Sequence, residues 1–121
     1  MKKVLVIDDE QDICSMLSRV LAEEAYQVFT ATSGEDGLKI FQDESPDLLL
    51  LDVRMQGMSG VETLRWIRDS DSGRPVVIIT GRATKMELEE ALRLGVSEII
   101  YKPFALQQVI EAVARALYPS P

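Results

Sequence analysis

The chain alternates between two hydrophobic patterns. Short apolar runs, the pattern of buried strands, occur at 4–7, 28–31, 48–51, 76–79 and 98–101. Each run is followed by a stretch in which apolar residues recur every three or four positions, the spacing of an amphipathic helix. The helical stretches run from Ile13 to about Glu24, through Leu38 and Phe41, from Val61 to Ile67, from Thr84 to Leu94 and from Leu106 to Leu117.

Local signals support the expected helix ends. Ser33 can cap the second helix, and Thr84 has the capping-box spacing to Glu87 at the start of the fourth. Gly95 is expected to end that helix, and a glycine-containing loop at 57–60 precedes the third. The fourth helix carries an acidic stretch that we expect to be a solvated face: Glu87, Glu89 and Glu90.

Five apolar strands that alternate with five helices predict an α/β fold: a parallel sheet with helices on both faces. Right-handed crossovers and one reversal of winding would make it a doubly wound sandwich. In such sheets the functional site lies beyond the carboxyl ends of the strands.

Composition narrows the class of protein. The 121 residues suit one domain, 1–121, in which 118–121 are the possible start of a linker. Thirteen Lys and Arg against 20 Asp and Glu give a net charge of −7, so we expect no direct nucleic-acid or membrane partner. The single Cys and the absence of His exclude an internal disulfide, a His-based zinc site and a His-dependent triad. No apolar run is long enough for a membrane span or a secretion signal, which favours a cytoplasmic location.

Reactive side chains stand where four of the strands end. Asp8 and Asp9 follow the first strand, Asp52 the third, Thr80 the fourth and Lys102 the fifth. If these strands are neighbours, the three carboxylates converge, repel one another and have raised pKa values. An all-oxygen ligand set of this kind suits Mg²⁺, or Mn²⁺ as a second possibility. With a lysine and a hydroxyl beside it, the cluster predicts a phosphoryl-binding site in which a carboxylate is the possible nucleophile.

These motifs resemble the response regulator receiver domain of bacterial two-component signalling. The resemblance covers about residues 2–118 and rests on 4–10 (VLVIDDE), 50–55 (LLDVRM), 57–60 (GMSG), 80–81 (TG) and 102–104 (KPF). It implies the strand order 2-1-3-4-5 of a flavodoxin-like three-layer sandwich. It also implies a phosphoprotein in a phosphorelay, not an enzyme acting on a separate substrate but a switch that catalyses its own phosphorylation and dephosphorylation.

Site roles follow from the resemblance. Asp52 would accept a phosphoryl group from the phosphohistidine of a sensor histidine kinase or a phosphotransfer protein. Asp9, Asp52 and the backbone carbonyl of Arg54 would bind Mg²⁺ directly, and Asp8 would act mostly through water. Lys102 would pair with the aspartyl phosphate.

The same resemblance assigns residues around the phosphoryl group. Thr80 would move inward to hydrogen-bond it, small Gly81 would leave room for access, and Pro103 would follow a cis peptide bond. The phosphorylated form would shift the surface made by the fourth helix, the fifth strand and the fifth helix. A downstream protein or an output domain would read that surface, and a homodimer could form through it.

Several positions depart from the family pattern. Gln56 replaces a common proline. Ile99 stands where the family usually has an aromatic residue, while Tyr101 directly precedes Lys102. We expect Ile99 to weaken the coupling between phosphorylation and the shift of that surface. An unchanged response to phosphorylation in Ile99→Tyr would contradict this. Arg54 and Arg82 either cover the phosphoryl group and slow attack by water or are solvated surface residues.

Two other classes of protein remain open at this point. One is an enzyme, either an aspartate-nucleophile phosphatase or a flavin-binding protein on a similar sheet. Those phosphatases usually have a second acid two residues after the nucleophile, where Arg54 stands here. The other is a degenerate receiver that only docks to partners, although such domains usually lose an acid, the threonine or the lysine.

Overall fold

The computed structural model describes residues 1–71 and 73–120. Within these residues the chain forms the five strands and five helices expected from the hydrophobic pattern, in strict alternation. Their bounds are β1 (Lys3–Ile7), α1 (Gln11–Glu23), β2 (Gln27–Ala31), α2 (Gly34–Glu44), β3 (Leu48–Leu51), α3 (Gly60–Ser70), β4 (Val76–Thr80), α4 (Lys85–Arg93), β5 (Glu98–Tyr101) and α5 (Leu106–Leu117).

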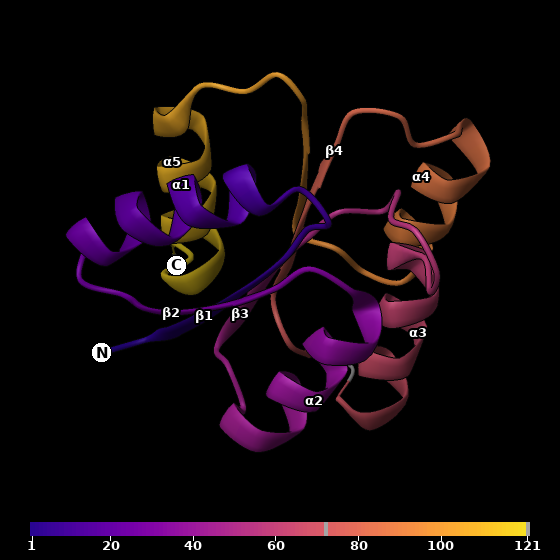
Figure 1. Ribbon diagram of the computed structural model, residues 1–121, viewed down its shortest axis with the longest axis horizontal. Helices are drawn as coiled ribbons and strands as arrows, with labels where there is room; N and C mark the ends of the chain where they lie inside the picture. The colour runs from indigo at the N-terminus through magenta and orange to yellow at the C-terminus, as the bar shows by residue number, and fades with distance from the viewer. Residues whose placement is uncertain (72, 121) are drawn as a thin grey trace.

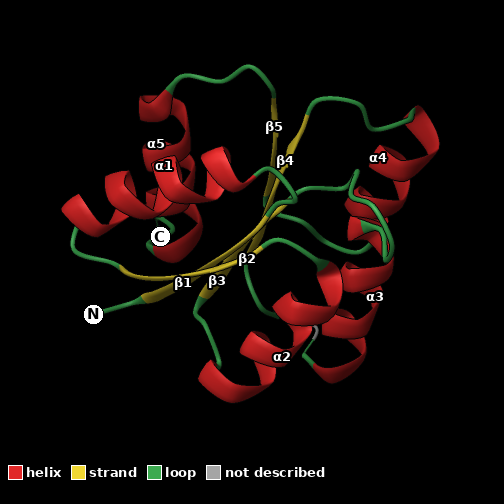
Figure 2. Ribbon diagram, in the orientation of Figure 1, coloured by secondary structure: helices red, strands yellow, loops and turns green. Residues whose placement is uncertain are grey.

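All strands run parallel in the order β2-β1-β3-β4-β5, which confirms the order implied by the receiver-domain motifs. Helices α1 and α5 cover one face of the sheet, and α2, α3 and α4 cover the other (Figures 1 and 2). The fold is therefore the predicted doubly wound, three-layer sandwich, with its hydrophobic core divided by the sheet.

The central strands are buried on both faces, as their continuous apolar sequences require. Every residue of β3 and β4 is buried, and so are four of the five residues of β1. The expectation that all five strands are buried is wrong for the outer pair: β2 begins at the exposed Gln27, and β5 ends at the exposed Tyr101. An edge strand has a neighbour on one side only and is less fully covered by helices, so polar residues are tolerated there.

The expected helix signals are present. The Ser33 hydroxyl accepts a hydrogen bond from the Asp36 backbone N–H at the start of α2. Thr84 and Glu87 form the complete capping box of α4, and Gly95 follows that helix with φ of 77°. A cap that the hydrophobic pattern did not reveal is Ser59, which accepts from the Glu62 N–H and begins α3.

The acidic stretch of α4 is not simply a solvated face. Glu89 is exposed, but Glu90 forms an ion pair with Arg65 on α3. Glu87 is half-buried and lies 3.7 Å from the Nε of Arg54. Two of the three acids are therefore held against basic side chains from other elements, because α3 and the β3–α3 loop pack beside α4.

At the C-terminal end, Tyr118, Pro119 and Ser120 continue beyond α5 without regular secondary structure. Pro121, the last residue of the expected linker, lies outside the described residues. None of the helices described here has the length and apolar character needed to cross a membrane.

Candidate functional site

Parallel pairing brings the ends of the central strands to one edge of the sheet. Ile7 pairs with Leu51, and Leu51 pairs with Ile78 on the next strand. The backbone N–H of Asp52 continues this pairing by donating to the carbonyl of Ile7 at 2.9 Å. The residues that follow the strands therefore leave the sheet side by side.

Three carboxylates meet at this edge. One oxygen from each of Asp8, Asp9 and Asp52 lies within 4.8 Å of the others. Asp8 and Asp52 are buried, and Asp9 is exposed. Burial is the main reason that the pKa values of the Asp8 and Asp52 carboxyls are raised, because desolvation disfavours the ionised form. This crowded all-oxygen donor set fits a small divalent cation such as Mg²⁺.

Lys102 enters the acidic cluster from the end of β5. Its Nζ donates to Glu10 Oε2 at 2.7 Å and to Asp52 Oδ2 at 3.1 Å, and it lies 2.9 Å from Asp8 Oδ2. Burial alone lowers the pKa of this ammonium, but the hydrogen bonds to the three carboxylates outweigh it and raise the pKa. Lys102 is therefore held as a cation at the Asp52 carboxylate.

Glu10 is a member of the site that the sequence motifs did not assign. Its carboxylate is largely exposed and is bound to Lys102, and this hydrogen bond holds the pKa of the Glu10 carboxyl below its usual range. Its position directly after the Asp8–Asp9 pair was the only signal. That signal was weak because an exposed acid in a loop needs no partner.

Thr80 ends β4 and Gly81 follows it; the Lys102 backbone N–H donates to the Thr80 carbonyl at 2.8 Å. The Thr80 hydroxyl is buried and has no hydrogen-bond partner among the described residues. A buried polar atom without a partner is unfavourable, so the Thr80 hydroxyl is free to hydrogen-bond a group that binds beside it. Gly81 lies against Lys102: a Cβ at this position would come within 3.4 Å of the Lys102 Cβ, which would narrow the opening.

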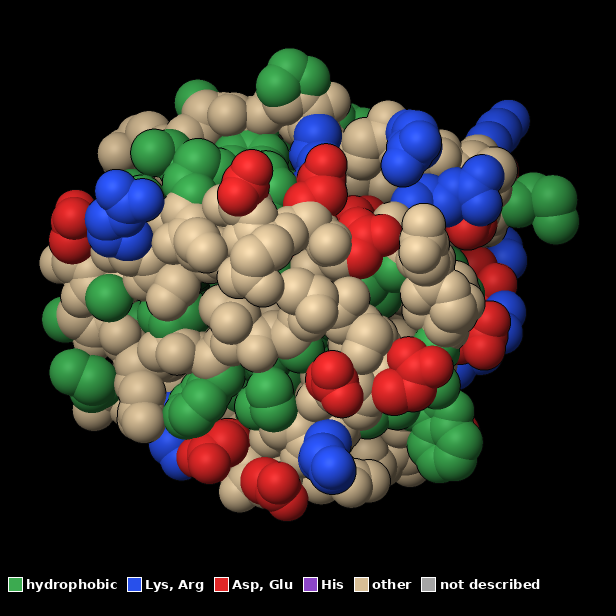
Figure 3. All heavy atoms as spheres, viewed as in Figure 1, with side chains coloured by type: hydrophobic (Ala, Val, Ile, Leu, Met, Phe, Trp, Pro, Cys, Tyr) green, Lys and Arg blue, Asp and Glu red, His purple; other side chains and the backbone are tan. Residues whose placement is uncertain are grey.

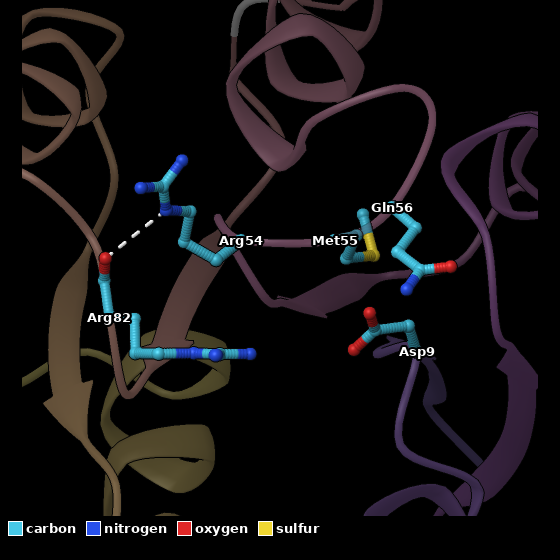
Figure 4. Close-up of a pocket in the computed structure, with 5 residues that line it drawn as sticks. All are labelled: Asp9, Arg54, Met55, Gln56 and Arg82. Carbon is cyan, nitrogen blue, oxygen red and sulfur yellow. Dashed lines mark hydrogen bonds between the residues drawn. The ribbon is translucent and has the colours of Figure 1, made fainter.

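A hollow of about 160 Å³ opens above Asp52. It is lined by Asp9, Glu10, Asp52, Arg54, Gly81, Arg82 and Lys102. A second hollow of about 290 Å³ adjoins it at Met55 and Gln56 (Figure 4). The Arg54 guanidinium is turned toward the β4–α4 loop and away from Asp9, and its Nε donates to the Arg82 carbonyl at 3.2 Å. A small anion can therefore reach Asp52 between basic and acidic walls.

The remaining predicted positions are not among the residues that line this hollow. Ile99 is half-buried and packs against the core cluster beneath α2, α3 and α4. Tyr101 is 59% exposed on the outer strand. The peptide bond between Lys102 and Pro103 is cis, as the motif implies.

Comparison with known proteins shows the family of this chain. The family model of the response regulator receiver domain matches residues 4–114. The chain therefore belongs to the response regulator receiver family. Receiver domains are phosphoacceptor switches that bind Mg²⁺ at an acidic pocket and interact with histidine kinases or phosphotransfer proteins and with output domains.

Individual relatives differ in size. Sporulation initiation phosphotransferase F of Bacillus subtilis is 34% identical over 116 residues, which are 96% of this chain and 94% of that protein. Regulatory protein AtoC of Escherichia coli is 35% identical over 115 residues, or 95% of this chain, but the match spans only 25% of AtoC. A CheY-like receiver domain protein from Methanospirillum hungatei superposes with a TM-score of 0.93 at 26% identity, over 97% of this chain and 94% of that one.

Asp52→Asn is expected to stabilise the metal-free protein at pH 7 by about 1 kcal/mol, because it removes a buried charge whose pKa is raised. A raised carboxyl pKa stabilises the wild-type fold below the unfolded pKa, and that contribution is lost as pH rises through the folded pKa. The advantage of the variant should therefore shrink as pH falls. Urea unfolding in a chelator measures this, with the exposed Asp43→Asn as control. An Asp52→Asn variant that is less stable than the wild type at pH 7 would contradict it.

Proposed function

We propose that this chain is a phosphoacceptor switch in which Asp52 receives a phosphoryl group from the phosphohistidine of a sensor histidine kinase or a phosphotransfer protein. The observation that carries the proposal is that the Asp52 carboxylate and the Lys102 ammonium line one hollow, while the buried Thr80 hydroxyl, without a partner among the described residues, ends the neighbouring strand β4. A nucleophile, a cation and a free hydroxyl together suit the transfer of a small anion.

Asp8, Asp9, Asp52 and the backbone carbonyl of Arg54 are the groups that would hold Mg²⁺. When bound, Mg²⁺ would neutralise negative charge on the attacking carboxylate and on the oxygens of the transferring phosphoryl group. The raised pKa of the Asp8 and Asp52 carboxyls supports this assignment, because a cation would relieve the cost of keeping both ionised.

In the proposed reaction, an Asp52 oxygen bonds to phosphorus and the phosphorus–nitrogen bond to the donor imidazole breaks. The imidazole keeps the electron pair and takes up a proton from solvent. Lys102 then pairs with one phosphoryl oxygen, and the Thr80 hydroxyl turns to donate to another. The aspartyl phosphate is lost by hydrolysis within the same site, so the chain catalyses both steps on itself.

Phosphorylation adds nearly two negative charges and three acceptor oxygens at Asp52. Thr80 and Lys102 move toward these oxygens. This movement biases an existing equilibrium between two conformations of the surface formed by α4, β5 and α5. A downstream protein or an output domain reads that surface, and a second copy of the chain can pair through it. The exposed Leu92, Tyr101 and Leu106 offer apolar contacts there.

Intact-mass spectrometry after incubation with acetyl phosphate tests the proposal, with and without Mg²⁺. We expect one phosphoryl increment on the wild type with Mg²⁺, none on Asp52→Asn, and a normal increment on the control Asp43→Asn. No increment on the wild type under any condition would overturn the proposal and favour a receiver that docks without phosphorylation.

The two arginines that line the hollow are expected to prolong the life of the aspartyl phosphate. Arg54 and Arg82 both line the space above Asp52, where their guanidinium groups can cover the phosphoryl oxygens. The double variant Arg54→Ala/Arg82→Ala should lose its phosphoryl group about fivefold faster, the scale of one partly exposed ion pair. The decay of the phosphorylated mass after removal of the donor measures this, and equal or slower decay in the double variant would contradict it.

A further inference from the structure

Besides the hollow at Met55 and Gln56, Arg54 borders two further cavities. On one side is the hollow of about 160 Å³ above Asp52. On the other is a groove of about 470 Å³ between α3 and α4, whose walls include Thr84 and Glu87. Figure 3 shows that acidic and basic side chains alternate closely on this side of the molecule. The Arg54 side chain can therefore reach a charge in either space.

Its present contacts belong to the groove side. The Arg54 Nε donates to the Arg82 carbonyl at 3.2 Å and lies 3.7 Å from Glu87 Oε1. The same Glu87 oxygen accepts from the Thr84 backbone N–H at 2.8 Å and closes the capping box of α4. One carboxylate thus joins the loop after the phosphoacceptor strand to the first turn of α4.

The ion pair between Arg54 and Glu87 is weak. The Arg54 side chain is 51% exposed and its distance from Glu87 is long, so the contact contributes little against solvent. A phosphoryl group on Asp52 would carry nearly two negative charges and three acceptor oxygens. Guanidinium groups bind such oxygens in pairs and strongly, so a phosphoryl group would outcompete Glu87 for Arg54.

We propose that Glu87 is a positioning residue that competes with the phosphoryl group for Arg54. In the unmodified protein Arg54 is held at Glu87 and the Arg82 carbonyl, and on phosphorylation it moves to the phosphoryl oxygens. The N-terminus of α4 then loses a cationic partner, which couples the modification to α4 without an aromatic side chain at Ile99. This inference rests on the proposed function of Asp52.

Binding competition is reciprocal, so removing the charge of Glu87 must favour the contact of Arg54 with the phosphoryl group. Glu87→Gln is the matched change, because its amide oxygen still accepts from the Thr84 N–H and keeps the cap. The aspartyl phosphate formed with acetyl phosphate and Mg²⁺ should then decay about two- to fivefold more slowly than in the wild type. Intact-mass spectrometry after removal of the donor measures the decay.

Glu89→Gln is the control, since it makes the same change of charge on the same helix at an exposed residue without a contact to Arg54. Its decay should match the wild type. A double-mutant cycle adds Arg54→Ala, in whose background Glu87→Gln should have no effect. If Glu87 acted only through the structure of α4, Glu87→Gln would still change the decay in the Arg54→Ala background.

The outcomes separate this inference from the proposed function. Slower decay in Glu87→Gln alone, abolished by Arg54→Ala, supports the competition. Equal decay in Glu87→Gln and Glu89→Gln, or an effect that survives Arg54→Ala, overturns the competition and leaves the phosphoacceptor role intact. A wild type that takes up no phosphoryl group overturns both.

Discussion

Lys102→Met is expected to slow the phosphorylation of Asp52 by about 100-fold, the scale of losing one preorganised charge at a reacting centre. Methionine has a similar length but no charge, so the space is kept and the ammonium is lost. The Lys102 Nζ lies 3.1 Å from the Asp52 carboxylate, where it can pair with charge that develops on a transferring oxygen. The rate of the mass increment with acetyl phosphate measures this effect.

The same variant should unfold more easily. Asp8 and Asp52 are buried, and both would lose the cation that now offsets part of their desolvation. We expect a loss of about 2–3 kcal/mol in the free energy of unfolding at pH 7, somewhat below the effect of breaking a fully buried pair.

Lys39→Met is the control for both measurements, because Lys39 is an exposed residue of α2. It should change the phosphorylation rate little and the stability by less than about 0.5 kcal/mol. If Lys102→Met behaves like Lys39→Met in the rate measurement, Lys102 has no part in the transfer.

Gly60→Ala is expected to destabilise the fold by about 3 kcal/mol, at the upper end for overpacking. Gly60 is the first residue of α3, and its backbone N–H donates to the Val53 carbonyl at 3.0 Å. A Cβ here would overlap the carbonyl oxygen of Asp52 and come within 2.5 Å of the Val53 Cα. Both obstacles are backbone atoms, so relief requires the α3 N-terminus or the Asp52 loop to move.

A series of glycine variants tests this explanation in urea unfolding. At Gly81 the nearest atom to an added Cβ is the Lys102 Cβ at 3.4 Å, and at Gly73 it is a side-chain oxygen of Asp71 at 3.9 Å. Gly81→Ala should therefore cost less than about 1 kcal/mol, and Gly73→Ala should be nearly neutral. Equal losses in all three variants would show that close backbone approach is not the cause.

Much of the fold was predictable because its causes are local. Strand β3 reads as four leucines, a short apolar run typical of a strand covered on both faces, and it is fully buried. Ser33 and Thr84 mark the starts of α2 and α4 through hydrogen bonds that span three residues. The burial of the outer strands was overestimated, since exposure at a sheet edge depends on which strand has no outer neighbour.

Local patterns in the sequence account for the alternation of strands and helices and for the acids, the threonine and the lysine at strand ends. Parallel strands share one carboxyl edge, so these residues had to meet once the strands were neighbours. Which side chains pair depends on how the whole chain folds. Lys102 reaches Glu10 across 92 residues of sequence, and Arg54 reaches Arg82 across 28. Such contacts depend on loop paths and side-chain rotamers, which the hydrophobic periodicity of the sequence does not predict. The same holds for the Thr80 hydroxyl, which has no partner among the described residues, because burial and hydrogen bonding are properties of the packed molecule.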